Sequence, residues 1–139
     1  MDDELKYYWK CSLIDINKRE VVKTKDFLLD ELPHNLGKHY PYSFSYLWIV
    51  TQFFGSHVIE DNQNKNQGRK GYPDFKIYSK DMKDIFYVEF KSTNDGLRLD
   101  QIKWYLNNKE KKYYILMCEE RSGFLKKSDI ISDLSNGSI

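Results

Sequence analysis

The sequence predicts a single mixed α/β domain, in which a helix, three strands, a second helix and a last strand follow an N-terminal β-hairpin. Three observations lead to this prediction. The chain has 139 residues, which suits one compact domain. Hydrophobic residues make up 40% of it, which is enough for one core. Segments with apolar residues at alternate positions are interspersed with segments in which such residues recur at helical spacing.

The first forty residues predict a β-hairpin followed by a short helix. Residues 7–16 and 20–23 are rich in strand-forming side chains, and Asn17 and Lys18 suit the turn between them. The hairpin is therefore expected within residues 5–24. Residues 26–32 have the composition of a short helix, which the Pro-containing segment 33–41 ends. We treat residues 1–40 as an extension of a core that spans residues 41–120.

The core region is expected to begin with a helix over residues 43–54. Its apolar residues recur at helical spacing, Ser43 suits the N-cap, and Gly55 suits the end. The other expected core elements are strands at 57–60, 73–78, 85–91 and 112–118 and a helix at 97–106. Residues 121–139 are expected to form a C-terminal tail with a helix at 128–134.

One predicted strand ends with an acid and a lysine on the same face. Alternate residues of a strand share a face, so Glu89 and Lys91 lie together. A hairpin folded about Met82 places Asp74 beside Glu89. Two neighbouring carboxylates repel each other unless a positive charge lies between them. The ion best suited to this position is a hard cation such as Mg²⁺ or Mn²⁺, with the backbone carbonyl of Phe90 as a third ligand.

Such a cluster suits the hydrolysis of phosphodiester bonds. A divalent ion can polarise a phosphoryl oxygen and lower the pKa of a water molecule. Lys91 can stabilise the developing negative charge or help to position the water. Pro73 restricts the backbone just before Asp74, and Gly71 would let a phosphate backbone approach closely.

Three segments resemble the motifs of the PD-(D/E)XK nuclease superfamily and are similar to its VRR-NUC branch. They are residues 71–75 (GYPDF), 87–91 (YVEFK) and 94–104 (NDGLRLDQIKW). The resemblance implies a restriction-endonuclease-like core, with Asp74 and Glu89 as metal ligands, Lys91 as a catalytic residue and Gln101 facing the site. It implies a Mg²⁺- or Mn²⁺-dependent endonuclease acting on DNA in repair, recombination, restriction or the replication of a virus or plasmid. Selectivity for a DNA structure is left open.

Some features leave alternatives open. Many relatives carry a further acid on the helix before the first core strand, but residues 43–54 contain no Asp or Glu. Gln52, Glu60 and Asp61 are the candidates for that place. The three histidines are scattered, and His39 is the candidate for a His-ligated manganese site as in some viral RNA endonucleases of the superfamily. The alternative functions are an RNA endonuclease of the same fold and an inactive nucleic-acid-binding or structural protein.

A polar segment before the first catalytic motif is a candidate nucleic-acid contact. Residues 62–71 include Lys65, Arg69 and Lys70, and the expected partner is DNA rather than RNA. The net charge is only +1, so such a role depends on local patches of this kind. The small size of the chain suits a stand-alone nuclease module, for which a homodimer is also a candidate state.

The sequence has no feature of a membrane or secreted protein. No run approaches the roughly 20 apolar residues of a membrane helix, and the acidic start is unlike a signal peptide. We therefore expect an intracellular protein without membrane contact, in the cytoplasm or in the nucleus of a eukaryote. Cys11 and Cys118 lie in apolar runs and are expected to be buried, reduced thiols.

Overall fold

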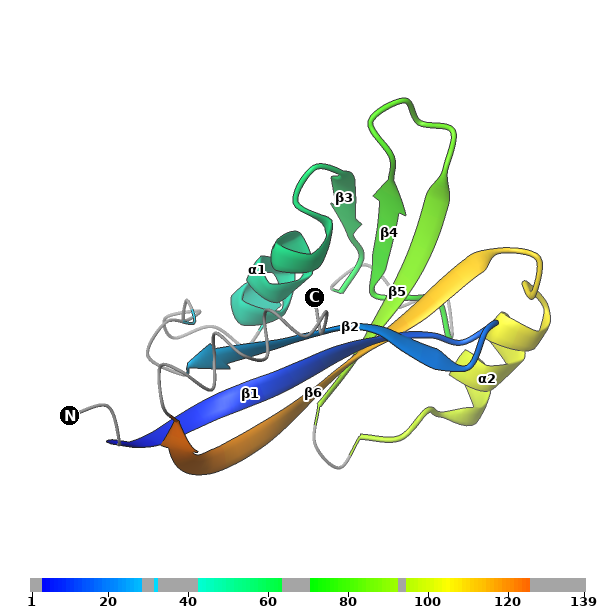
Figure 1. Ribbon diagram of the computed structural model, residues 1–139. Helices are drawn as coiled ribbons and strands as arrows, with labels where there is room; N and C mark the ends of the chain where they lie inside the picture. Colours follow the sequence, from blue (N-terminus) through cyan, green and yellow to red (C-terminus); the bar gives the residue numbers. More distant parts are fainter. Residues whose placement is uncertain (1–3, 29–31, 33–42, 64–70, 93–94, 126–139) are drawn as a thin grey trace.

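The computed structural model describes residues 4–28, 32, 43–63, 71–92 and 95–125, which form one six-stranded sheet and two helices (Figure 1). The mixed α/β class is thereby confirmed. In chain order the elements are β1 (Glu4–Asp15), β2 (Glu20–Leu28), α1 (Ser43–Phe54), β3 (Val58–Asp61), β4 (Phe75–Tyr78), β5 (Ile85–Ser92), α2 (Leu99–Leu106) and β6 (Lys112–Leu125). Neither helix of this described part is long and apolar enough to cross a membrane.

The strands are arranged in the order β2-β1-β6-β5-β4-β3. All neighbours are antiparallel except β5 and β6, which are parallel and are connected through α2. The long strands β1, β2 and β6 form a ribbon from which β3, β4 and β5 rise (Figure 1). The N-terminal hairpin is therefore continuous with the core sheet through the pairing of β1 with β6.

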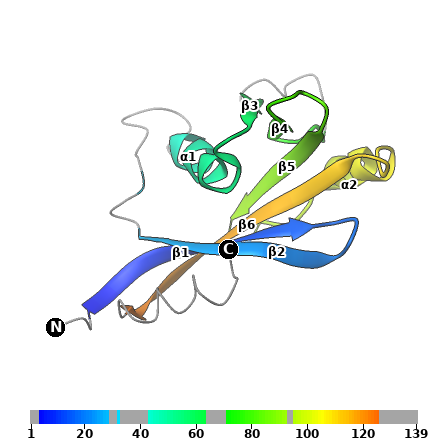
Figure 2. The ribbon, with the colours of Figure 1, turned by 45° about the horizontal axis from the view of Figure 1, so that its top comes forward.

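The two helices lie on either side of the central strands β5 and β6 (Figure 2). The main hydrophobic core lies on the side of α1, and its most buried sheet residues are Cys11, Phe75, Ile77, Val88 and Leu116. A smaller cluster on the side of α2 contains Tyr87, Tyr113 and Ile115, packed against Trp104. Strand alternation places Glu89 and Lys91 on this second face, beneath α2.

The predicted short helix at residues 26–32 is wrong where the structure describes it. Residues 26–28 belong to β2, and Leu32 is not helical. Phe27 is buried opposite Trp9 of β1, so pairing across the hairpin outweighs the local preference of the segment. At the other end of the chain, β6 continues to Leu125, into the segment expected to be a tail. The expected helix at 128–134 lies outside the described residues.

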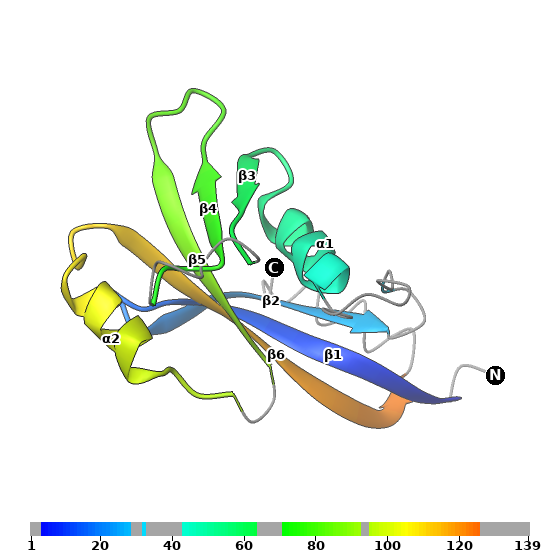
Figure 3. The same cartoon turned by 180° about the vertical axis from the view of Figure 1, so that it is seen from behind.

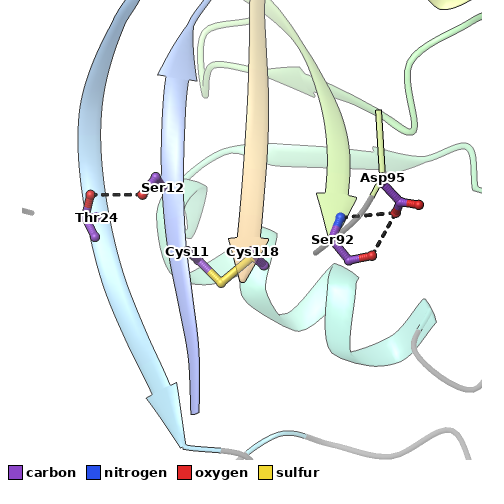
Figure 4. Close-up of a disulfide and its surroundings, with 6 residues drawn as sticks. All are labelled: Cys11, Ser12, Thr24, Ser92, Asp95 and Cys118. Carbon is purple, nitrogen blue, oxygen red and sulfur yellow. Dashed lines mark hydrogen bonds between the residues drawn. A yellow bond between two sulfur atoms is a disulfide. The ribbon is translucent and has the colours of Figure 1, made fainter. Parts of the chain in front are cut away.

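The expectation of reduced cysteines is also wrong, because Cys11 and Cys118 are joined in a disulfide (Figure 4). The antiparallel register of β1 and β6 places them directly opposite each other, with their Cα atoms 4.1 Å apart. They are separated by 107 positions in the sequence. Burial statistics favour reduced thiols for cysteines in apolar runs. They carry no information on the pairing of β1 with β6, which places these two side chains opposite each other.

Candidate active site

Asp74 and Glu89 meet at one end of the β4–β5 hairpin. Phe75 is paired with Val88, and extending this register by one residue places Asp74 opposite Glu89. The connecting turn contains Met82 in a left-handed conformation, with φ of 62°. The backbone N–H of Phe90 donates to Oδ2 of Asp74 at 3.0 Å. This hydrogen bond holds the Asp74 carboxyl group against β5.

A glutamine from α2 links the acid and the lysine of β5. Lys91 Nζ donates to Gln101 Oε1 at 2.9 Å, and Gln101 Nε2 donates to Glu89 Oε1 at 3.0 Å. The exposed fractions of Glu89, Lys91 and Gln101 are only 2%, 7% and 4%. The structure therefore brings Asp74, Glu89, Lys91 and Gln101 into one cluster beneath the first turn of α2. Figure 3 shows α2 on the side of β5 and β6 that is away from α1.

The segment before α2 holds Gln101 in place. The backbone N–H of Arg98 donates to Gln101 Oε1 at 2.9 Å, so this oxygen accepts from both Arg98 and Lys91. The Asp100 carboxylate accepts from the backbone N–H of Gln101 and pairs with the Arg98 side chain at 3.2 Å. These bonds reduce the freedom of the glutamine before any ligand is present.

Asp95 closes the turn that follows Lys91. Its carboxylate accepts hydrogen bonds from the backbone N–H of Ser92 at 3.2 Å and from the Ser92 hydroxyl at 2.7 Å (Figure 4). In the sequence, Asp95 stands out only as part of the motif at residues 94–104. Its role in the turn could have been inferred, because Ser and Asp often close turns through such local bonds.

Gly71 permits a close approach within the chain itself. Its φ is +80°, and a Cβ atom there would collide with the carbonyl group of Asp100. The segment that leads to Asp74 therefore packs directly against the first turn of α2. The structure gives Gly71 a packing role within the chain, and the approach of a phosphate backbone at this residue stays a prediction.

Burial perturbs both carboxyl groups of the site. Burial, and then the negative charge of Asp74, raise the pKa of Glu89 to about 9. Burial also raises the pKa of Asp74, against the opposing charge of Lys91. Among the residues that the structure describes, the Tyr113 hydroxyl is buried without a hydrogen-bond partner, and Glu89 Oε2 is buried with no partner other than the Asp74 carboxyl group, with which Glu89 shares a hydrogen bond. Buried polar atoms are seldom left without a partner. Asp74 and Glu89, which we call the acid pair, are therefore suited to an additional positively charged partner.

The donor set fits a hard divalent cation. Asp74 and Glu89 offer carboxylate oxygens, which such cations prefer. The described part of the chain contains no group of three or more His, Cys, Asp or Glu side chains that could hold a metal ion. Further ligands would have to come from backbone carbonyls or water, which suits Mg²⁺ because it usually keeps several waters.

The other candidate acids occupy different positions. Glu60 is exposed, lies opposite Lys76 in the β3–β4 register and has Asn62 Nδ2 at 3.5 Å from its Oε2. The negative charge of Asp61 acts on Asp74 and contributes to the rise of its pKa. Asp61 is thus the better placed of the two, although its carboxylate already accepts from the backbone and side chain of Gln63.

The remaining candidates are away from the cluster or outside the described residues. Gln52 is an exposed residue of α1, the helix on the other side of the sheet. The ring of His57 packs edge-on against Phe54 and Phe86 in the region of the main core. His34, His39, Lys65, Arg69 and Lys70 lie outside the residues that the structure describes.

Comparison with known proteins gives one match. Residues 49–120, about half of the chain, match the model of the VRR-NUC domain. This region contains all four members of the cluster: Asp74, Glu89, Lys91 and Gln101. The searches of curated proteins and of solved structures gave no match.

Proposed function

The chain belongs to the VRR-NUC domain family of the PD-(D/E)XK nuclease superfamily, and from this premise we propose that it is a metal-dependent DNA endonuclease. Membership of the family indicates a nuclease-type function on nucleic acid. The observation that carries the finer proposal is the buried acid pair. The carboxyl groups of Glu89 and Asp74 lie against each other and share a hydrogen bond, and Lys91 is linked to Glu89 through Gln101.

Asp74 and Glu89 are the side chains that would hold Mg²⁺ or Mn²⁺. When bound, such an ion supplies Lewis-acid activation of a phosphoryl oxygen and of a water molecule. The backbone carbonyl of Phe90 is a further donor. The N–H of Phe90 points to Asp74, and both polar groups of a strand residue face the same neighbouring strand.

Lys91 brings a positive charge to the reacting phosphate. Its ammonium group is oriented by Gln101, and this same glutamine donates to Glu89. A buried ammonium group stabilises negative charge that develops on a phosphoryl oxygen more strongly than an exposed one. Gln101 is a positioning residue in this scheme, because it sets the relative placement of the lysine and the acid.

The test is a cleavage assay on plasmid DNA with Mg²⁺ or Mn²⁺. Asp74→Asn, Glu89→Gln and Lys91→Met nearly preserve side-chain size and should fold, and each should lose cleavage. Glu60→Gln is the matched control, because Glu60 is exposed and lies opposite Lys76 rather than in the acid pair. Excess EDTA should stop the reaction. A wild-type rate in purified Glu89→Gln protein would overturn the proposal.

RNA substrates in the same assay decide between the two nucleic acids. Preferred cleavage of RNA would transfer the proposal to an RNA endonuclease with the same acid pair. Linear, nicked, branched and single-stranded DNAs would reveal any structural selectivity. A role in repair, recombination or viral replication, a homodimeric state and an intracellular location stay predictions from the sequence.

A further inference from the structure

Two ammonium groups lie near the ring of Tyr87 on the α2 side of the sheet. Lys76 Nζ is 5.7 Å from the ring centroid, and Lys111 Nζ is 5.8 Å from it. Tyr87 is buried and packs against Trp104, whose ring centroid is 5.1 Å away. Lys76 and Lys111, which we call the lysine pair, come from β4 and from the turn before β6. Cation–π contacts of this kind draw both ammonium groups toward one place.

The lysine pair lies two residues along the strands from the acid pair, which is the distance between successive side chains on one face of a strand. Lys76 follows Asp74 by two residues, and its register partner Tyr87 precedes Glu89 by two residues. Phe75 and Ile77 are buried in the main core, so Lys76 points to the opposite side of the sheet, where Glu89 lies. Residues two apart in a strand are separated by about 6.8 Å. A phosphate next to one held at the acid pair would therefore come within reach of the lysine pair.

The charges of the lysine pair are poorly neutralised within the described part of the chain. Lys76 forms no ion pair there, although Glu60 lies opposite it in register. Among the described acids, Glu110 is the one that pairs with Lys111, at 4.0 Å and in an exposed position. Exposed pairs at such a distance contribute little energy. Both ammonium groups thus remain available to an anionic ligand.

A third cation lies on the other side of the acid pair. Gln101 contacts Glu89 and Lys91, whereas Trp104 contacts Tyr87, so α2 runs antiparallel to β5. Arg98, which directly precedes α2, must therefore lie toward the Lys91 end of the strand. Its side chain is 69% exposed, and its positive charge acts on Glu89. Asp100 pairs with it at the surface.

We infer that the substrate strand passes the acid pair over the half-buried β4 residues beside α2, because α2 covers β5 itself, with one flanking phosphate held by the lysine pair and the other by Arg98. This inference rests on the proposed function and names its substrate class. A strand bound in this way carries phosphates on both sides of the scissile bond, so the cut is internal rather than at a terminal nucleotide. The ligand recognised is the phosphodiester backbone.

The test combines protein variants with neutral phosphate analogues in binding measurements. The cut position is first mapped with wild-type protein on one oligonucleotide. Two modified copies of that oligonucleotide are then made. One carries a single uncharged methylphosphonate on the 5′ side of the cut, and the other carries it on the 3′ side. Binding is measured in the Glu89→Gln background, alone and combined with Lys76→Gln/Lys111→Gln or with Arg98→Gln. Lys23→Gln/Lys25→Gln is the matched control on β2, where both side chains lie on the α1 face of the sheet.

The lysine-pair variant should make the dependence of log affinity on log salt less steep by about one unit, because the pair neutralises one phosphate and each neutralised phosphate contributes about one. It should also become insensitive to the methylphosphonate on one side of the cut. The Arg98 variant should become insensitive to the one on the other side. The β2 control should retain both sensitivities.

The two proposals fail differently. Wild-type cleavage of the parent oligonucleotide tests the nuclease function by itself. If the wild type cleaves but the lysine-pair and Arg98 variants keep their affinity, salt slope and both analogue sensitivities, the proposed strand path is wrong and the nuclease function stands. If wild-type protein neither binds nor cleaves any nucleic acid, both proposals are overturned.

Discussion

The ammonium group of Lys91 donates to the side-chain oxygen of Gln101 at 2.9 Å, with both side chains buried. The nitrogen of the same amide donates to Glu89 at 3.0 Å. A glutamine amide has one acceptor end and one donor end, so it matches a lysine on one side and a carboxylate on the other. Helix α2 therefore takes part in placing two residues that both belong to β5.

Replacing Gln101 by Ala should slow cleavage by roughly 10- to 100-fold, the range expected when an outer-shell partner of a metal ligand is lost. The same variant should need more Mg²⁺ for half-maximal binding, because Glu89 loses a donor that orients it. Gln52→Ala on the exposed face of α1 is the matched control and should change neither quantity. Calorimetric titration of Mg²⁺ separates this role from a general loss of structure. Unchanged Mg²⁺ affinity in Gln101→Ala would show that the amide does not position Glu89.

Metal binding should depend on pH through Glu89. Burial, and then the charge of Asp74, raise the pKa of Glu89 to about 9, so the carboxyl group is largely protonated at neutral pH. A cation must displace that proton, so Mg²⁺ affinity should rise with pH up to about 9. Titrations in two buffers of different ionisation enthalpy should reveal proton release. Glu89→Gln should abolish it, and affinity that stays constant between pH 6 and 9 would contradict the assignment.

The same pKa shift has a consequence for stability in the absence of metal. The folded state holds the Glu89 proton up to about pH 9, whereas the unfolded chain releases it near the ordinary glutamate pKa of 4.5. The folded state therefore binds more protons in this window, and the free energy of unfolding contributed by Glu89 falls as pH rises from about 4.5 to about 9. The pKa of Asp74 is raised as well, so its contribution has the same sign. Denaturant unfolding of wild type and Glu89→Gln across this range measures the difference.

The part of the site that arises from local geometry could be predicted from the sequence. Strand alternation places Glu89 and Lys91 on one face, and a short hairpin brings Asp74 beside them. Gln101 was different, because only the resemblance to a family indicated it. Its bonds depend on where α2 crosses β5, and no spacing in the sequence encodes that crossing.

Features that depend on non-local pairing could not be predicted. The disulfide and the full length of β2 both follow from the pairing of β1 with its two neighbours. Arg98 was overlooked because an exposed cation before a helix is common in any sequence. Its position relative to Glu89 follows from the direction of α2.

Removing the disulfide should lower stability but spare the chemistry. It joins residues separated by 107 positions. A cross-link of that span lowers the conformational entropy of the unfolded chain, which raises the free energy of unfolding by up to about 4.7 kcal/mol. We expect Cys11→Ala/Cys118→Ala to lose about 2–4 kcal/mol of unfolding free energy. Both sulfur atoms lie in the core beside α1, on the opposite face from Glu89. The cleavage rate well below the unfolding temperature should therefore be kept.

Ser12→Ala/Thr24→Ala provides the matched control for the disulfide. These hydroxyl groups contact each other at 3.3 Å across β1 and β2 (Figure 4). Losing such a cross-strand pair should cost no more than about 1 kcal/mol. A reductant should lower the unfolding temperature of the wild type and of this control, but not that of the cysteine variant. Equal unfolding temperatures of wild type with and without reductant would show that the cross-link does not contribute.

Gly71→Ala should damage stability and catalysis together. Gly71 has φ of +80°, where a residue with a Cβ is strained by about 1–2 kcal/mol. The added methyl group would also collide with the Asp100 carbonyl, and this forces the first turn of α2 away from the segment that leads to Asp74. Gln101 directly follows Asp100, so its bonds to Lys91 and Glu89 should lengthen. The expected result is a lower unfolding temperature and a slower cleavage rate in the fraction that remains folded.

Gly96→Ala is the control, because a Cβ there meets nothing within 4 Å. If both variants cleave at the wild-type rate when folded, the packing of Gly71 against α2 is not what positions Gln101.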